Sequence, residues 1–191
     1  MKARTLALLS LLTLGVAPAV HAQDGTAYYG LSLGEIDYSE DVFTDTTSTW
    51  HLMVGYMFTE HLGVEGAYGE SDNIRDTETF GGILPGTQDQ VTYETQLDRI
   101  LTIRLVGMLP FGKSGISLIG GIGYADIKQD LAISVNGLPF ASGDVSGNTP
   151  TYFGALQYDF ERLAIRLGYE KYDFDAGVDG EETSITFFYK L

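Results

Sequence analysis

Apolar and polar side chains alternate along most of this sequence, in segments of about ten residues, the length that a tilted strand needs to cross a bilayer. Leu101, Ile103 and Leu105 recur at every second position, with polar residues between them. A period of two places one kind of residue on each face of a strand. The pattern predicts eight strands, near residues 26–37, 48–58, 62–70, 96–109, 115–125, 151–159, 162–171 and 182–191.

The connections between these predicted strands are alternately short and long. Those after the second, fourth and sixth strands are brief, as at Thr59-Glu60-His61. Short turns at one end and long loops at the other are typical of an up-and-down barrel. The sequence therefore predicts an all-β fold, an eight-stranded antiparallel up-and-down transmembrane β-barrel. The long loops are expected at about residues 38–47, 71–95, 126–150 and 172–181.

Aromatic residues separate a membrane barrel from a soluble barrel of the lipocalin type. On the predicted apolar faces, aromatic side chains stand at both ends of an aliphatic band, where the two interfaces of a bilayer would lie. Aromatic residues also favour strands in general, so the girdles are one argument among several. The predicted girdles are Tyr56, Phe58, Tyr158, Phe160 and Tyr189 at the short-turn end, and Trp50, Tyr68, Tyr124 and Tyr169 at the other.

The N-terminal residues predict export. Lys2 and Arg4 precede an apolar run, and a small-residue site ends at Ala22, which is the layout of a secretory signal peptide. We therefore expect a signal peptide at residues 1–22 and one barrel domain at residues 23–191. The apolar run is too short for a spanning helix. The chain has no cysteine, so disulfides cannot stabilise the exported protein.

The balance of charge is strongly acidic, with a formal net charge of -15. Such a chain is not expected to bind nucleic acid, because both would be anionic. The acidic loops either form a solvated surface or approach lipopolysaccharide through divalent cations. Asp175 and Asp179 lie in an oxygen-rich stretch, but their spacing does not match an EF-hand loop. The sequence predicts no metal or cofactor site.

Short motifs follow one another along the chain at residues 28–34, 55–58, 62–68, 120–124 and 163–170. Taken in order, they resemble the small outer-membrane β-barrel domain family, of the OmpA-barrel and OmpX type. The closing residues 184–191 also resemble the family's C-terminal assembly signal, with Leu191 where the family usually has phenylalanine. The resemblance implies the outer membrane of a Gram-negative bacterium, and roles as structural anchors, adhesins, immune-evasion proteins or minor pores.

The interior of an eight-stranded barrel is just wide enough for side chains to fill it. Glu65, Arg104, Arg166 and Glu170 fall on the predicted inward faces, and Asp98 is mapped inward with them. We expect the first four to form a structural charge network in the lumen, in which Glu65 and Arg104 neutralise each other. A gated polar path for small ions is the alternative.

The expected function is a structural or surface-contact role of the adhesion type, with a minor, porin-like pore as the alternative. Apolar stretches in the predicted loops, at residues 80–85 and 137–140, favour contact. The expected partners are outer-membrane lipids, lipopolysaccharide and an extracellular ligand. A lipid A-modifying enzyme is the least favoured reading. His51 lies near Ser48 and Asp45, but no nucleophile with a base in reach can be identified, so we predict no catalytic residue.

Overall fold

The computed structural model describes residues 25–40, 43–81, 88–112, 114–173 and 179–191. The predicted signal peptide lies outside these ranges. No helix within them is long and apolar enough to cross a membrane. The described residues form the strands β1 (Thr26–Glu40), β2 (Phe43–Met57), β3 (Leu62–Ser71), β4 (Ile74–Gly81), β5 (Gln88–Pro110), β6 (Ile116–Val135), β7 (Leu138–Phe160), β8 (Leu163–Asp173) and β9 (Asp179–Lys190).

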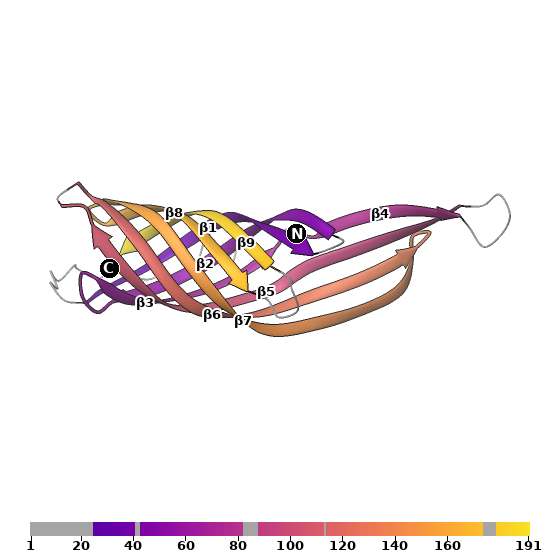
Figure 1. Cartoon of the computed structure of the whole chain (residues 1–191), viewed down its shortest axis with the longest axis horizontal. Helices are drawn as coiled ribbons and strands as arrows, with labels where there is room; N and C mark the ends of the chain where they lie inside the picture. The colour runs from indigo at the N-terminus through magenta and orange to yellow at the C-terminus, as the bar shows by residue number, and fades with distance from the viewer. Residues whose placement is uncertain (1–24, 41–42, 82–87, 113, 174–178) are drawn as a thin grey trace.

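These strands form one antiparallel sheet that closes on itself (Figure 1). The strand order is β3-β2-β1-β9-β8-β7-β6-β5-β4, and β3 also pairs with β5. β3 pairs with residues 100–107 of β5, and β4 pairs with residues 88–95. β4 thus follows β3 along the same edge of β5, and the two strands share one position in the ring. The closed barrel therefore has eight strand positions. The predicted eight-stranded up-and-down barrel is confirmed.

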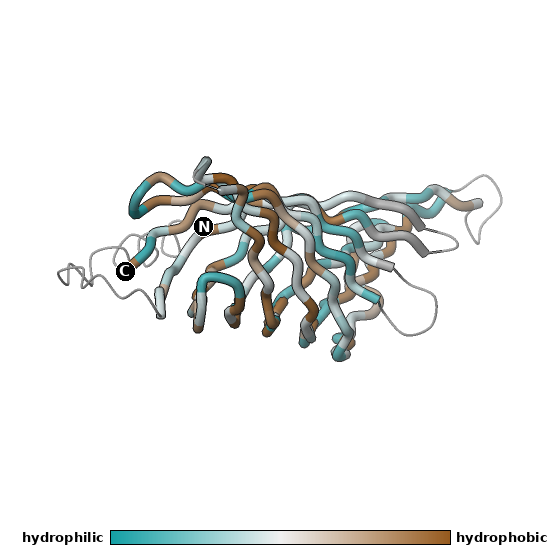
Figure 2. The backbone as a smooth tube through the Cα atoms, turned by 60° about the vertical axis from the view of Figure 1, so that its left-hand side comes forward, coloured by the Kyte–Doolittle hydropathy of each residue, from teal (hydrophilic) through white to brown (hydrophobic). Residues whose placement is uncertain are grey.

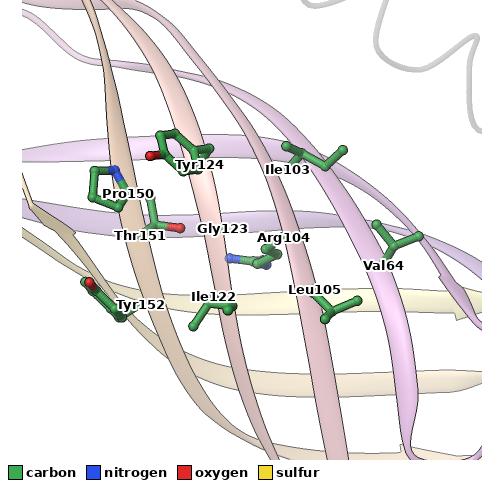
Figure 3. Close-up of a pocket in the computed structure, with 10 residues that line it drawn as sticks. All are labelled: Val64, Ile103, Arg104, Leu105, Ile122, Gly123, Tyr124, Pro150, Thr151 and Tyr152. Carbon is green, nitrogen blue, oxygen red and sulfur yellow. The ribbon is translucent and has the colours of Figure 1, made fainter.

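The outer wall is apolar and the inside is mixed, as a membrane barrel requires. Ile103 and Ile122 are each 63% exposed, whereas Met53, Thr102 and Arg104 are buried. Figure 2 shows hydrophobic and hydrophilic residues alternating along the strands of the barrel. In Figure 3, a shallow groove of about 460 Å³ on the outer wall is lined by side chains that include Ile103, Leu105, Ile122 and Tyr152.

Aromatic side chains contact one another at both ends of this apolar wall. At the short-turn end, the ring centroids of Tyr158 and Phe160 lie 4.5 Å apart. At the other end, the ring centroids of Trp50 and Tyr68 lie 6.2 Å apart. Aromatic rings at two levels fit the two interfaces of a bilayer.

The long loops predicted at residues 38–47, 71–95 and 126–150 are wrong. β1 runs to Glu40 and β2 begins at Phe43, and the other two stretches are also largely strand. Ile74 to Gly81 pair with β5, and β6 pairs with β7 as far as Val135↔Leu138. We call this extension the blade and define it as residues 74–81, 88–97 and 127–149. Figure 1 shows that it projects well beyond the barrel at one end of the molecule. The strands therefore continue past the length that a bilayer requires.

Candidate functional site

A group of four charged side chains occupies the middle of the lumen. Nε of Arg104 donates to Oε2 of Glu65 over 2.8 Å, and Nη1 of Arg104 donates to Oε2 of Glu170 over 2.6 Å. Nη1 of Arg166 donates to Oε1 of Glu65 over 2.7 Å. Glu65 and Arg166 are each only 1% exposed. The structure thus places together the four residues that alternation maps inward, from strands β3, β5 and β8.

Neutral side chains complete this lumen network. The hydroxyl of Tyr28 donates to Oε1 of Glu65 over 2.6 Å. The guanidinium carbon of Arg104 lies 4.0 Å from the ring centroid of Phe153, and that of Arg166 lies 4.3 Å from the centroid of Phe188. Aromatic faces favour desolvated cations. Sequence reasoning missed these three rings, although Phe153 and Phe188 have the inward parity of their strands.

A second polar cluster lies in the lumen around Glu182. Nε2 of His51 lies 2.7 Å from Oε1 of Glu182, and Thr49 donates to the same oxygen over 2.5 Å. The hydroxyl of Tyr172 donates to Oε2 over 2.7 Å. Glu182 is at an inward position by parity, so its place could have been found from the sequence. Its partners could not, because they stand on other strands.

The position of His51 bears on the enzyme hypothesis. Its side chain is buried and contacts Glu182, whereas Ser48 is exposed on the opposite face of β2. The structure therefore does not bring His51 and Ser48 together as a nucleophile and base. The side chain of Asp45 lies outside the described part of the structure.

An apolar layer lies in the part of the lumen nearest to the blade. Its members come from β1, β5, β6 and β8 and are almost fully buried. These apolar side chains fill that part of the lumen, and the Tyr172 hydroxyl among them donates to Glu182. The layer consists of Ile36, Leu97, Ile100, Ala125, Ile127 and Tyr172.

The inward position predicted for Asp98 is wrong. A register shift between Leu97 and Arg99 interrupts the pairing of β5 with β6, and such a bulge reverses which residues point inward. Asp98 is exposed, and Nζ of Lys128 lies 3.5 Å from its Oδ2. The bulge places Leu97 in the lumen and Asp98 outside.

Candidate metal ligands do not cluster among the described residues. Within them, no three histidine, aspartate or glutamate side chains lie close enough together to hold a metal ion. The side chains of Asp175 and Asp179, which raised the question of calcium, fall outside the part of the chain that the structure describes.

One face of the blade carries most of its apolar side chains, with Thr95 and Gln129 hydrogen-bonded to each other among them. Tyr93 is opposite Ile133, and Val91 is opposite Val135, in the pairing of β5 with β6. Directly paired residues point to the same side of a sheet. Leu97 points to the same side of β5 as Tyr93, and Ile127 points to the same side of β6 as Ile133. Both Leu97 and Ile127 are in the buried layer of the lumen, so this side of the blade continues the lumen face of the barrel. We call it the inner face of the blade.

Comparison with solved structures shows the same fold in proteins of low identity. The attachment invasion locus protein Ail of Yersinia pestis, in complex with the heparin analogue sucrose octasulfate, is 17% identical with a TM-score of 0.60, over 88% of this chain and 99% of that chain. Neisserial surface protein A is 10% identical with a TM-score of 0.61, over 86% and 97%. OprG from Pseudomonas aeruginosa is 15% identical with a TM-score of 0.50, over 89% and 96%.

Comparison with known sequences gives the family. No curated protein matches the chain. The family model of the outer membrane protein beta-barrel domain matches residues 6–190 of the sequence. The resemblance seen in the sequence motifs is therefore confirmed, and the chain belongs to the outer membrane protein β-barrel domain family.

Proposed function

We propose that this protein is a closed barrel of the cell outer membrane that makes contact with external surfaces through its blade. The observation that carries the proposal is the blade itself. Its four strands continue the hydrogen-bonded ladder of the barrel wall, so they form a stiff sheet. A barrel that served only as an anchor would not need strands longer than the bilayer.

The packing of the lumen supports a structural role for the charge network and disfavours a pore. The arginine and glutamate side chains meet one another in the lumen, and the apolar layer lies where the barrel joins the blade. A cavity of about 300 Å³ at the short-turn end is lined by Arg166 and Phe188, among others. In planar bilayers we expect no stable single-channel steps. Regular steps would favour the minor pore.

We also propose that the protein is not an enzyme. His51 is the histidine of the candidate trio with Ser48 and Asp45, and its imidazole contacts Glu182 inside the barrel. Mass spectrometry of lipid A from cells with and without the protein should give identical species. A mass difference of an acyl chain would support the enzyme instead.

The ligand expected on the blade differs in charge from the sulfated sugar bound by Ail. The blade carries six acidic and two basic residues. A polyanion would be repelled by such a surface. We therefore infer that the extracellular partner is neutral or cationic, while the apolar outer wall contacts the outer-membrane lipids and the lipid part of lipopolysaccharide.

Shortening the blade at paired residues tests its role in surface contact. Asp76 pairs with Tyr93, and Asp130 pairs with Asp144. Residues 77–92 and 131–143 can therefore each be replaced by an Asn-Gly turn, which joins two antiparallel strands directly. Cells that display the shortened protein should lose attachment to polystyrene and to cultured epithelial cells, relative to cells that display the full chain at equal density.

The control is the heat-dependent gel mobility of both proteins, which should be the same if the barrel is intact. Unchanged attachment by an intact, shortened barrel would overturn the proposed function.

A further inference from the structure

The inner face of the blade presents an open apolar surface. Tyr93 is 39% exposed, Leu131 40% and Val145 58%. Ile133 is opposite Tyr93 and Val135 is opposite Val91, and the side chains of Ile133 and Val135 are half-buried. A contiguous apolar patch on an exposed sheet often marks a site of contact with another protein.

Acidic residues border this patch on the side of β4. Asp76 is opposite Tyr93 and Glu78 is opposite Val91, so both carboxylates stand on the inner face. Asp89 is opposite Phe80 on the same face. In the part of the chain that the structure describes, no lysine or arginine forms an ion pair with these three residues. Their negative charge is therefore not neutralised locally.

The opposite face of the blade differs from the inner face in its polarity and in the pairing of its charges. It carries hydroxyl side chains, such as Thr77 and Thr92, whose oxygens lie 3.1 Å apart. Both cations of the blade also stand there. Nε of Arg75 lies 3.3 Å from Oε1 of Glu94, and Nζ of Lys128 lies 3.1 Å from Oδ1 of Asp130.

We propose that the inner face binds a cationic amphipathic helix of another protein or peptide. Its apolar side would cover Tyr93, Ile133 and Val135, and its lysine or arginine side chains would reach Asp76 and Glu78. Helices of this kind bind apolar surfaces through residues three and four positions apart. The proposal rests on the proposed function, because it names the partner class of the blade.

Charge decides against the other occupants. A second copy of this chain would bring an acidic border to the same apolar patch without a cation to meet Asp76 or Glu78. A sulfated polysaccharide has no apolar side to cover the patch, and within the described residues the inner face offers its sulfates no cation. Only a partner with both apolar and basic side chains complements this surface.

The test uses the full protein in nanodiscs of zwitterionic phosphatidylcholine. The probe is a fluorescent 18-residue helix of leucine and lysine, and its binding is followed by anisotropy against empty nanodiscs. A peptide of the same composition with its leucines scattered around the helix is the peptide control. We expect the amphipathic peptide to bind the protein-loaded nanodiscs at least about tenfold more tightly than the scattered peptide does.

Two variants remove the two parts of the surface separately. Asp76→Asn with Glu78→Gln should weaken binding about tenfold and flatten its dependence on salt, because two charge contacts are lost. Ile133→Thr with Val135→Thr keeps β-branched residues in the strand and should weaken binding by a similar factor, with the salt dependence unchanged. The matched control is Asp130→Asn with Asp144→Asn, which removes the same charge from the opposite face and should leave affinity within about twofold.

Two results would overturn the inference. One is binding no tighter than to empty nanodiscs. The other is an equal loss in both pairs of charge variants, which would mean that net charge alone attracts the peptide. If the shortened blade abolishes surface attachment but the peptide does not bind, the inference fails and the proposed function stands. If the peptide binds as expected and shortening leaves attachment unchanged, the proposed function fails while the inner face remains a binding surface.

Discussion

Glu65 accepts hydrogen bonds from side chains of three other strands. Tyr28 stands on β1, Arg104 on β5 and Arg166 on β8, and Glu65 itself is on β3. A carboxylate buried in this way is stabilised by its cations, and the cations depend equally on the carboxylate. Removing one member of a buried charge group leaves the others unpaired in a medium of low dielectric.

Glu65→Gln should therefore destabilise the barrel strongly. The substitution leaves Arg166 without an ion pair and Arg104 with Glu170 only, and we expect a loss of about 3–5 kcal/mol in the free energy of unfolding. Urea unfolding in lipid vesicles, followed by Trp50 fluorescence and gel mobility, measures it. Glu60→Gln in the exposed turn is the control, and an equal midpoint for the two variants would contradict the role given to Glu65.

Two glycines test how closely the lumen is packed. A Cβ at Gly69 would lie 2.2 Å from Nδ1 of His51 and 2.4 Å from the carbonyl oxygen of Trp50, whereas one at Gly154 would meet nothing within 4 Å. Gly69→Ala should cost about 1–3 kcal/mol of stability through overpacking, and Gly154→Ala should cost nothing measurable. The same urea titration compares them, and a tolerant Gly69 would mean that His51 is not held in place.

The strands of the barrel were easier to predict than those of the blade. Within the bilayer, one face meets lipid and the other meets a packed lumen, so side-chain polarity alternates strongly, as at residues 101–105. The blade does not face lipid. Threonine and serine are common on its polar side, so the alternation of polar and apolar residues is weaker there. A period of two was nevertheless present at Leu131, Ile133 and Val135. Strand lengths predicted from the thickness of a bilayer end before this stretch.

The charged residues of the lumen could likewise be predicted only in part. Alternation was enough to point Glu65, Arg104, Arg166 and Glu170 to one side of their strands. It failed at Asp98, because a bulge changes parity locally and leaves no clear trace in the sequence. Contacts between distant strands, such as that of His51 with Glu182, depend on the stagger of the barrel, which periodicity does not contain.

The turn at Asn136 and Gly137 should control the order of the blade and leave the barrel unaffected. Both residues have positive φ, 52° and 77°, as a two-residue hairpin turn prefers. The Asn136 amide also donates to Asp89 over 2.8 Å and accepts from the backbone of Gln90 over 2.9 Å, so it ties the hairpin to β5.

Asn136→Ala should therefore make the blade more sensitive to proteinase K, with cleavage several times faster and a resistant barrel fragment. Ser142→Ala, within the same hairpin, is the control and should be cleaved at the rate of the unmodified protein. Equal rates for both variants would show that the turn does not hold the blade together.

At the scale of the whole molecule, one continuous sheet is surrounded by lipid in the barrel and by water in the blade. The wall that carries Ile103 is apolar because lipid surrounds it, and the lumen contains paired charges and a layer of apolar side chains. Beyond the bilayer, the same strands keep an apolar side although no lipid faces it. This difference underlies the proposal that the barrel anchors the protein and the blade makes the contact.

Spin labels at three positions test this division most directly. In bilayers, a label at Ile103 should collide with oxygen, a label at Ile133 with a water-soluble relaxation agent, and a label at Val106 with neither. This result is predicted because the three side chains face lipid, the extracellular medium and the packed lumen. A label at Ile103 that reports water, or a label at Val106 that is as accessible as the one at Ile133, would contradict a closed membrane barrel that carries an exposed blade.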